Sequence, residues 1–238
     1  MKKHELSHLL KDHPDKPDSA DEKSEENLMR DLQHRLLRIQ QGIWHQKVRV
    51  IFVFEGFDAA GKGGIIRRIT ENWDPRGVRV HPIGAPSPQE QKRHYLYRFW
   101  KKLPDPGTIV IFDRSWYGRV LVEKVDKLID KKDVERSYPE INEFEKMLTD
   151  DGICLFKFFI AISKKEQLDR FEDRLNDPYK LWKLNLDDIR ARKHWDDYVK
   201  AADRMLHETD TKHAPWHLIW GNHKPSARNE VLSILCKN

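Results

Sequence analysis

A glycine-rich loop with an embedded lysine most constrains what this 238-residue chain can fold into. Gly56 to Lys62 reads G-x-x-x-x-G-K; it follows an apolar run at 48–54 and precedes a helical pattern that begins at Ile65. Glycine permits backbone conformations that turn N–H groups inward on a phosphate, and the following helix points the positive end of its dipole at the same anion. The pattern therefore predicts a phosphate-binding loop of the Walker A type, the alternative being a glycine-rich turn that binds nothing. The loop residues predicted to hold phosphate with Lys62 are Gly56, Phe57, Ala59, Ala60, Gly61, Gly63 and Gly64.

The loop departs from the usual motif at the position after the lysine. A Ser or Thr hydroxyl normally holds the metal there, but this chain has Gly63. Either another group holds the metal, or the loop binds phosphate without a metal of its own. Asp58 lies inside the loop and Asp113 ends the third apolar run, and ligands of open α/β sheets collect at the carboxyl ends of the strands. Both aspartates are the predicted metal ligands, although Asp113 could instead cap a helix or a turn.

Three arginines complete the predicted catalytic set. Arg114 follows Asp113, Arg119 lies further into a charged segment, and Arg174 lies in a later helical stretch. Because a guanidinium can hold two phosphate oxygens and keeps its charge, these residues could stabilise a phosphoryl group in transfer. For each of them a solvated surface position is the alternative.

Alternation of strands and helices predicts the architecture. Five short apolar runs are the predicted strands, at 48–54, 78–80, 108–112, 155–162 and 216–220. Helical patterns fill the intervals, at 24–43, from 65, at 89–102, 116–150, 164–174, 187–208 and 225–235. Strands that alternate with helices form a parallel sheet covered on both faces, so we expect a three-layer α/β/α sandwich around a parallel five-stranded sheet.

Composition limits the setting in which such a domain works. The net charge of +5 favours an anionic partner, for which nucleic acid, a membrane surface, a nucleotide and polyphosphate all qualify. Two distant cysteines, of which Cys154 lies in an apolar run and is expected to be buried, favour a reducing cytoplasm. Residues 1–23 are charged and contain two prolines, so they predict a flexible N-terminal arm before a domain at 24–238. The absence of an apolar stretch of about 20 residues predicts a protein that does not enter the membrane.

Several motifs resemble the polyphosphate kinase 2 family. They are the loop Gly56–Gly63, Phe112–Tyr117 (FDRSWY), 176–184 (NDPYKLWKL), Trp195–Tyr198 (WDDY), Thr209–Thr211 (TDT) and Ala214–Trp216 (APW). The similarity runs from about Arg30 to Leu235, and a glycine in place of the usual Ser or Thr is a family trait.

The resemblance implies a P-loop kinase fold related to thymidylate kinases, with a helical lid at about 116–150. It implies reversible, Mg²⁺-dependent phosphoryl transfer between inorganic polyphosphate and a nucleotide (AMP, ADP or GDP). Asp58 and Asp113 would hold Mg²⁺, Lys62 would bind phosphates, and Arg114, Arg119 and Arg174 would bind phosphoryl groups from the lid side. A homodimer or homotetramer is expected, without nucleic acid as a partner.

The acceptor and two rival functions stay open at this point. Segments 117–123 and 139–145 are most similar to the branch that converts AMP to ADP, but that branch is often built from two fused copies, so a nucleoside diphosphate acceptor is possible. An ATP-dependent nucleoside monophosphate kinase is one rival, although its loop would normally carry Ser or Thr at position 63. A non-catalytic nucleic-acid-binding protein is the other, since the chain is basic and has eight tryptophans; Asp58 and Asp113 would repel phosphate unless a metal lay between them.

Overall fold

The computed structural model describes residues 6, 9–10, 21–179, 181–183 and 186–237. The predicted N-terminal arm, 1–23, therefore falls largely outside the described residues, as do positions 180 and 184 of the NDPYKLWKL motif. Within the arm, Leu6 is fully buried against the hydrophobic core and Leu9 and Leu10 pack on it. At these three positions the chain contacts the domain, and the flexible arm as a whole stays a prediction.

A parallel five-stranded sheet forms the centre of the molecule, as predicted. Its strands are β1 (Arg49–Gly56), β2 (Val78–Pro82), β3 (Ile109–Asp113), β4 (Ile153–Ala161) and β5 (Trp216–Trp220), in the spatial order β2-β3-β1-β4-β5. β1 is central because it is apolar on both faces, and Val50 to Phe54 are all buried. All four strand pairs are parallel, so every strand ends at the same edge of the sheet.

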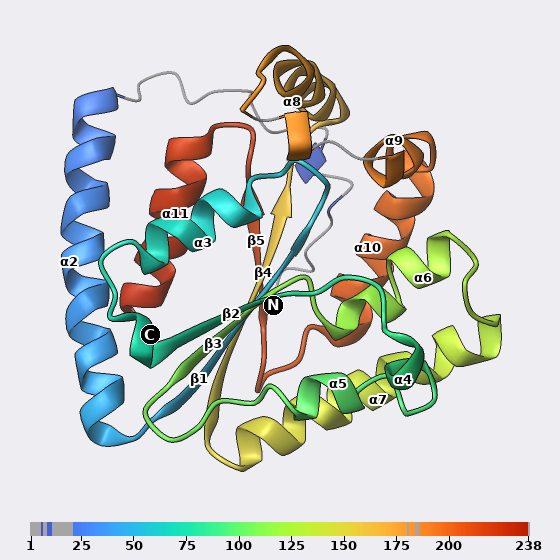
Figure 1. Cartoon of the computed structure of the whole chain (residues 1–238), viewed down its shortest axis with the longest axis horizontal. Coiled ribbons are helices and arrows are strands. Elements are labelled where there is room, and N and C mark those ends of the chain that lie inside the picture. Colours follow the sequence, from blue (N-terminus) through green and yellow to red (C-terminus); the bar gives the residue numbers. More distant parts are fainter. Residues whose placement is uncertain (1–5, 7–8, 11–20, 180, 184–185, 238) are drawn as a thin grey trace.

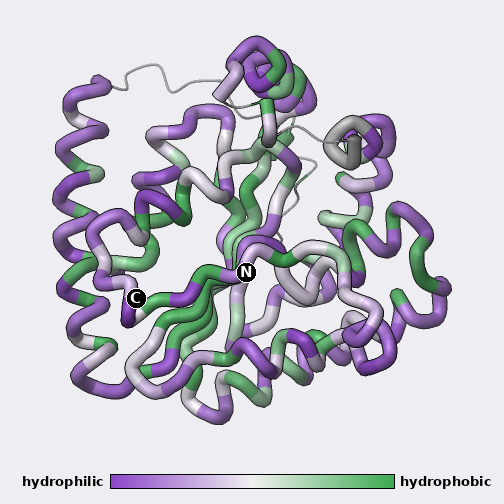
Figure 2. Tube along the Cα trace, viewed as in Figure 1, coloured by the Kyte–Doolittle hydropathy of each residue, from purple (hydrophilic) through white to green (hydrophobic). Residues whose placement is uncertain are grey.

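Helices cover both faces of this sheet, which confirms the three-layer α/β/α sandwich (Figure 1). α2 (Glu22–Gln46), α3 (Lys62–Thr70) and α11 (Lys224–Lys237) pack together on one face. α7 (Lys131–Asp150) packs on β4 from the other face and carries α10 (Trp195–Thr209) beside it. α8 (Lys164–Asn176) follows the carboxyl end of β4 and leads to α9 (Leu186–Lys193). The strands are the most hydrophobic part of the chain, and helices such as α2 consist largely of hydrophilic residues (Figure 2).

The remaining elements are short. They are η1 (Pro75–Gly77), α4 (Pro88–Gln91), α5 (Tyr97–Trp100), η2 (Trp116–Arg119), α6 (Val122–Val125) and η3 (Leu181–Lys183). No helix in the described ranges is long and apolar enough to cross a membrane.

Two helix predictions differ from the structure in extent. The helix predicted at 89–102 is two single turns, α4 and α5. A capping box of Ser87 and Glu90 begins α4, and between the two helices the ring of His94 accepts the N–H of Leu96, a side-chain bond that competes with the helical pattern. The first helix begins at Glu22 rather than near Ser24, since Asp21 caps it by accepting the N–H of Lys23.

The segment 116–150, for which the family resemblance implies a lid, contributes apolar residues to the hydrophobic core, and the lid itself stays a prediction. Ile141 and Phe144 of α7 are fully buried, and η2 carries the buried Trp116 and Tyr117. Burial of this apolar face holds α7 against the sheet.

Cys154 is exposed, which corrects the prediction of a buried thiol. β5 begins at Trp216, which pairs with Lys157. The first four residues of β4 therefore extend beyond β5 and pair with β1 alone. The side chain of Cys154 consequently lies at an uncovered end of the sheet.

Candidate active site

The glycine-rich loop turns at the carboxyl end of β1 and leads into α3. Gly56 and Gly61 have φ values of 138° and 101°, and Ala59, a residue with a side chain, has a φ of 59°. At Gly56 only glycine fits, because a β-carbon would overlap the backbone carbonyl of Ile160 in β4. A β-carbon on Gly63 would meet nothing within 4 Å, so the first turn of α3 is open. Its N–H groups and helix dipole favour an anion there, as the motif predicts.

Lys62, the first residue of α3, lies against the loop. Its side chain is buried, and Nζ donates to the carbonyl oxygens of Gly56 at 2.9 Å and Phe57 at 3.0 Å. Burial lowers the pKa of Lys62, and the charge of Arg114 lowers it further, whereas Asp58, Asp113 and Glu55 raise it. Lys62 therefore lies in the field of one cation and three carboxylates at the end of the central strands.

Asp58, Asp113 and Arg114 lie beside this lysine. Asp113 ends β3 and pairs in register with Phe54 of β1. Arg114 has a φ of 64°, donates its N–H to the Phe54 carbonyl at 2.9 Å, and forms an ion pair with Asp58, with Nη2 2.6 Å from Oδ1. The structure thus groups four of the predicted residues, Asp58, Lys62, Asp113 and Arg114, from two segments about fifty positions apart.

The donor set at this edge suits a divalent ion that is shared with a substrate. No group of three or more His, Cys, Asp or Glu side chains that could hold a metal occurs among the described residues. Mg²⁺ is commonly held by one or two carboxylates together with phosphate oxygens of the substrate, rather than by a complete protein cage. Two aspartates beside a phosphate loop fit that mode of binding.

Arg119 and Arg174 are placed differently from the other four. Arg119 forms an ion pair with Glu123 at 2.8 Å, and its guanidinium lies 5.0 Å from the centre of the Tyr95 ring. Arg174 lies in the last turn of α8, with its guanidinium 5.8 Å from the centre of the Phe171 ring. Glu123 and Phe171 lie on the same segments as these arginines, whereas Tyr95 lies between α4 and α5; the roles of both arginines toward phosphate remain predictions.

α8 supplies two supports for the loop that the sequence did not indicate. Gln167 donates to the carbonyl of Asp58 at 3.2 Å, and Arg170 donates to the carbonyl of Ala59 at 2.9 Å. The buried Arg170 also donates to the carbonyls of Gly221 at 2.6 Å and Asn222 at 3.0 Å. These bonds connect the phosphate loop to α8 and to the turn after β5. They fix the carbonyl of Ala59, whose φ is unfavourable for a residue with a side chain.

A group of cations continues from the loop along α3 and α11. A β-carbon on Gly64 would lie 3.5 Å from Nη2 of Arg228. Burial lowers the pKa of Arg228, as do the charges of Arg68, Arg170 and Arg67. Burial likewise lowers the pKa of Lys224, and Arg170 adds to that effect. Several positive charges at short range raise the affinity of this flank of the loop for an anion.

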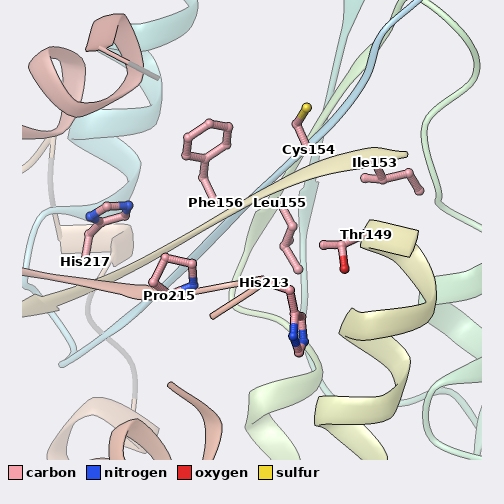
Figure 3. A pocket seen from close by; sticks show the side chains of 8 residues that line it. All are labelled: Thr149, Ile153, Cys154, Leu155, Phe156, His213, Pro215 and His217. Atoms are coloured by element: carbon pink, nitrogen blue, oxygen red, sulfur yellow. The ribbon is translucent and has the colours of Figure 1, made fainter. Parts of the chain in front are cut away.

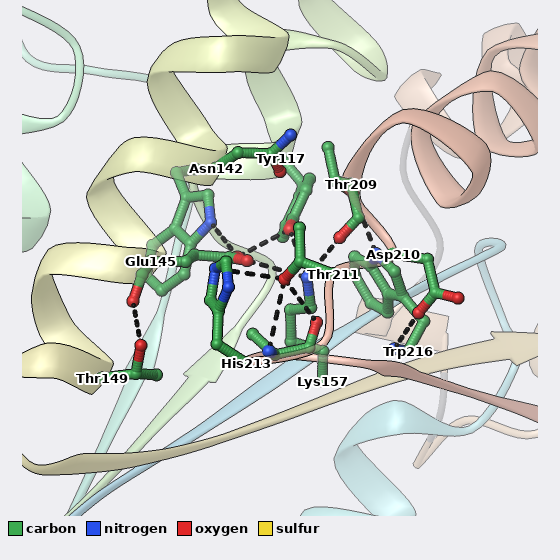
Figure 4. A network of polar contacts seen from close by, with 12 residues as sticks. Tyr117, Asn142, Glu145, Thr149, Lys157, Thr209, Asp210, Thr211, His213 and Trp216 are labelled. Carbon is green, nitrogen blue, oxygen red and sulfur yellow. Dashed lines mark hydrogen bonds and ion pairs between the residues drawn. The ribbon is translucent and has the colours of Figure 1, made fainter.

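The segment after Arg114 is anchored in the core by a buried polar network (Figure 4). Glu145 of α7 accepts from Trp116 Nε1 at 3.0 Å and from the Tyr117 hydroxyl at 2.6 Å. Lys157 of β4 forms a fully buried ion pair with Glu145 at 2.7 Å, and its Nζ also donates to the Tyr117 hydroxyl. The network holds the FDRSWY segment to α7 and β4.

A pocket of about 320 Å³ lies at the other end of the sheet (Figure 3). Its lining includes Ile153 and Cys154 from the start of β4, together with His213 and His217 around β5. Since β4 starts there and the phosphate loop contacts Ile160 near the end of the same strand, this pocket is separate from the loop.

Comparison with known proteins agrees with the geometry of the loop. The family model Polyphosphate kinase 2 (PPK2) matches residues 19–238. Polyphosphate:AMP phosphotransferase of Acinetobacter johnsonii is 49% identical over 189 residues, which cover 79% of this chain and 40% of that protein. ADP-polyphosphate phosphotransferase 1 of Rhizobium meliloti is 44% identical over 93% of this chain and 73% of its own length.

Solved structures extend the similarity to the whole fold. A polyphosphate kinase 2 structure from Pseudomonas aeruginosa superposes with a TM-score of 0.92 at 40% identity, over 98% of this chain and 50% of that chain. Polyphosphate kinase 2 from Arthrobacter aurescens gives a TM-score of 0.90 at 31% identity, over 99% of this chain and 89% of that chain. The chain spans less than half the length of the polyphosphate:AMP phosphotransferases that it matches, 40% of one and 43% of another.

Proposed function

Because the chain belongs to the polyphosphate kinase 2 family, we propose that it transfers phosphoryl groups reversibly between inorganic polyphosphate and a nucleotide. The observation that carries the proposal is the grouping of Asp58, Lys62, Asp113 and Arg114 at one edge of the sheet, with the open first turn of α3 beside them. Cations and amide dipoles there match a chain of phosphates, and two carboxylates match a metal that accompanies it.

We assign each residue a role in binding or orientation. Lys62 and the N–H groups of the loop would hold the phosphates between donor and acceptor, and Arg114 would neutralise charge on the group in transfer. Asp58 and Asp113 would hold Mg²⁺, which supplies charge neutralisation to the phosphates when it is bound. Arg170 and Gln167 would keep the loop in the conformation that presents its N–H groups.

The positive flank formed by Arg67, Arg68, Lys224 and Arg228 supports a long anionic donor. A nucleoside triphosphate presents only three phosphates to a loop of this kind, whereas polyphosphate continues past it. Cations on α3 and α11 suit the longer chain better because they can neutralise further phosphates, although Arg68 already forms an ion pair with Glu71 at 2.9 Å. Glycine at position 63, in place of a metal-binding hydroxyl, likewise favours polyphosphate over ATP as the donor.

AMP is the acceptor that we propose, with a nucleoside diphosphate as the alternative. Proteins named polyphosphate:AMP phosphotransferase are 44 to 49% identical to this chain, and those named for ADP, GDP or nucleoside diphosphates are 39 to 44% identical. The domain bounds 24–238, a homodimer or homotetramer, and a cytoplasmic location are further proposals that rest on the sequence and the family.

An acceptor panel tests this function. The purified chain is incubated with polyphosphate, Mg²⁺ and either AMP, GMP, ADP or GDP, without ATP, and products are separated by anion-exchange chromatography. We expect ADP from AMP, and loss of product when EDTA is added or when Lys62 is replaced by alanine. Formation of triphosphates alone would move the assignment to the diphosphate acceptor, and no new nucleotide in any arm would contradict the proposal.

The same preparation distinguishes the nucleic-acid-binding alternative. A protein of that class would bind DNA or RNA with an affinity that falls steeply with salt and does not respond to polyphosphate. We expect any such binding to be displaced by polyphosphate, because both ligands would compete for the same cations.

A further inference from the structure

A buried carboxylate lies between the two segments that form the site. Glu55 is the last residue before Gly56, directly after the apolar residues 50–54 of β1, and its side chain is 4% exposed. Its oxygen Oε1 accepts a hydrogen bond of 2.8 Å from the hydroxyl of Ser115, which is also buried. Ser115 directly follows Arg114, so this buried bond joins the start of the phosphate loop to the Asp113–Arg114 turn.

Burial of the Glu55 carboxylate lowers the stability of the fold, which points to a role other than packing. Burial raises the pKa of Glu55, and the Ser115 hydrogen bond and the charges of Lys62 and Arg114 only oppose that effect. Glu55 forms no ion pair within 4 Å in the described part of the chain, unlike the buried Glu145, which has Lys157 at 2.7 Å. A valine in this strand position would avoid the desolvation of a charge.

Ser115 itself is fixed on both sides. Its hydroxyl donates to Glu55 and accepts the N–H of Tyr117 at 3.3 Å, which caps η2. The residue before it, Arg114, is held at a φ of 64°, a conformation that is unfavourable for arginine and must be imposed by its surroundings. The Glu55–Ser115 bond is one of the contacts that impose it, together with the Arg114 N–H bond to Phe54.

We propose that Glu55 is a positioning residue for phosphoryl transfer, which holds Ser115 and so fixes Asp113 and Arg114 relative to Lys62. The inference rests on the proposed function of the site. Glu55 would touch neither substrate nor metal; it would act through Ser115 and through its charge, which faces Lys62 and Arg114 across a water-poor interior. Displacement of a positioned group by about 1 Å can lower a rate by about a hundredfold, so a single buried bond can matter this much.

The test compares Glu55→Gln, Ser115→Ala and the double variant with the unmodified chain. Glutamine keeps the size and an oxygen that can accept from Ser115 but removes the charge, and alanine removes the hydroxyl but keeps the charge of Glu55. Ser137→Ala is the matched control, because Ser137 is a fully buried serine whose hydroxyl donates to Asp133 within α7. The measurements are kcat and KM with polyphosphate and AMP, melting temperature, and amide hydrogen exchange over 113–117.

We expect kcat to fall by about 10- to 100-fold in Glu55→Gln and in Ser115→Ala, with KM changed far less. The double variant should be little worse than the poorer single variant, because both changes act on one connection: Glu55→Gln removes the charge that strengthens the Ser115 bond, and Ser115→Ala removes the bond itself. Exchange over 113–117 should be faster in both and unchanged in Ser137→Ala. A Glu55→Gln variant with a higher melting temperature and a lower kcat would show that Glu55 serves positioning and not folding.

The proposal is overturned if Glu55→Gln keeps kcat within about twofold of the unmodified chain, or if the two losses multiply independently. It is also overturned if kcat falls only in step with melting temperature. If Glu55→Gln does not fold, Ser115→Ala against Ser137→Ala decides the question. An unmodified chain without turnover would contradict the proposed function instead, and the exchange data would then decide whether Glu55 holds the turn.

Discussion

Replacement of Lys157 by methionine probes the buried network that anchors the segment after Arg114. Lys157 is fully buried in β4, and its Nζ donates to Glu145 at 2.7 Å, to the Tyr117 hydroxyl at 2.9 Å and to the Thr209 carbonyl at 2.8 Å. Methionine fills a similar volume but donates nothing. Glu145 would be left as a buried charge without its cation.

The size of the effect follows from what Glu145 keeps. Removal of one partner of a buried ion pair costs about 3–5 kcal/mol of unfolding free energy. Glu145 would retain its bonds from Trp116 and Tyr117, so we expect the lower end, about 3 kcal/mol. For a chain of this length that corresponds to a melting temperature lower by roughly 6–12 °C. The double variant Lys157→Met with Glu145→Gln should recover most of the loss, because the unpaired charge is gone.

Urea unfolding followed by tryptophan fluorescence measures these free energies. Lys146→Met is the matched control, since Lys146 forms an exposed pair with Asp150 on α7 and should change stability by less than about 0.5 kcal/mol. A loss below about 1 kcal/mol in Lys157→Met, or a double variant less stable than either single variant, would refute the reasoning.

Three further predictions concern the site. Gly56→Ala should destabilise the chain by about 3 kcal/mol or more, because its β-carbon would overlap the Ile160 carbonyl; a melting curve unchanged from that of the unmodified chain would contradict this. Asp113→Asn should abolish turnover and leave the melting temperature within a few degrees; near-normal activity would show that Asp113 holds no metal. The raised pKa of Glu55 means that the folded chain keeps this proton above the usual pKa of 4.5, so its contribution to stability falls as pH rises from there. Glu55→Gln lacks that loss, so its stability relative to the unmodified chain should increase between about pH 4.5 and 7 in urea unfolding, and parallel curves would contradict this.

The sequence predicted the sheet and the phosphate loop because their signals are local. Each strand is a short apolar run, and the conformations at Gly56 and Gly61 demand the glycines that mark the loop. The meeting of Asp58 with Asp113 followed from one topological rule, since parallel strands end at the same edge of a sheet. The sequence did not predict the spatial order of the strands in the sheet, because that order is decided by packing.

The supports of the site were missed because they act across the fold. Arg170 lies 111 positions from the carbonyl of Ala59 that it holds, and in the sequence it is one more charge in a polar helix. Glu55 and Lys157 did carry a signal in the sequence. Glu55 directly follows the predicted strand at 48–54, and Lys157 is a charged residue within the predicted strand at 155–162. Such a residue must be paired or hydrogen-bonded when it is buried, so both positions could have been singled out, although their partners could not.

The helical predictions that differed show the same limit. The segment between 89 and 102 was expected as one basic aromatic helix, but it forms two turns, and between them the ring of His94 accepts the N–H of Leu96. The segment 116–150 was expected only as a charged helical stretch, yet α7 has an apolar face that packs on β4 and α10. Charge on the outer face of a helix does not report what the inner face contacts.

The most direct test of the proposed function is to identify the donor of the phosphoryl group. ADP formation from AMP and Mg²⁺ is followed by ³¹P NMR with either polyphosphate or ATP as the sole donor, using the unmodified chain and Lys62→Ala. We predict that AMP is converted to ADP with polyphosphate as the donor, that the polyphosphate signal falls as ADP forms, and that Lys62→Ala does not carry out this conversion. ADP formed with ATP and not with polyphosphate would contradict this prediction and indicate a nucleoside monophosphate kinase.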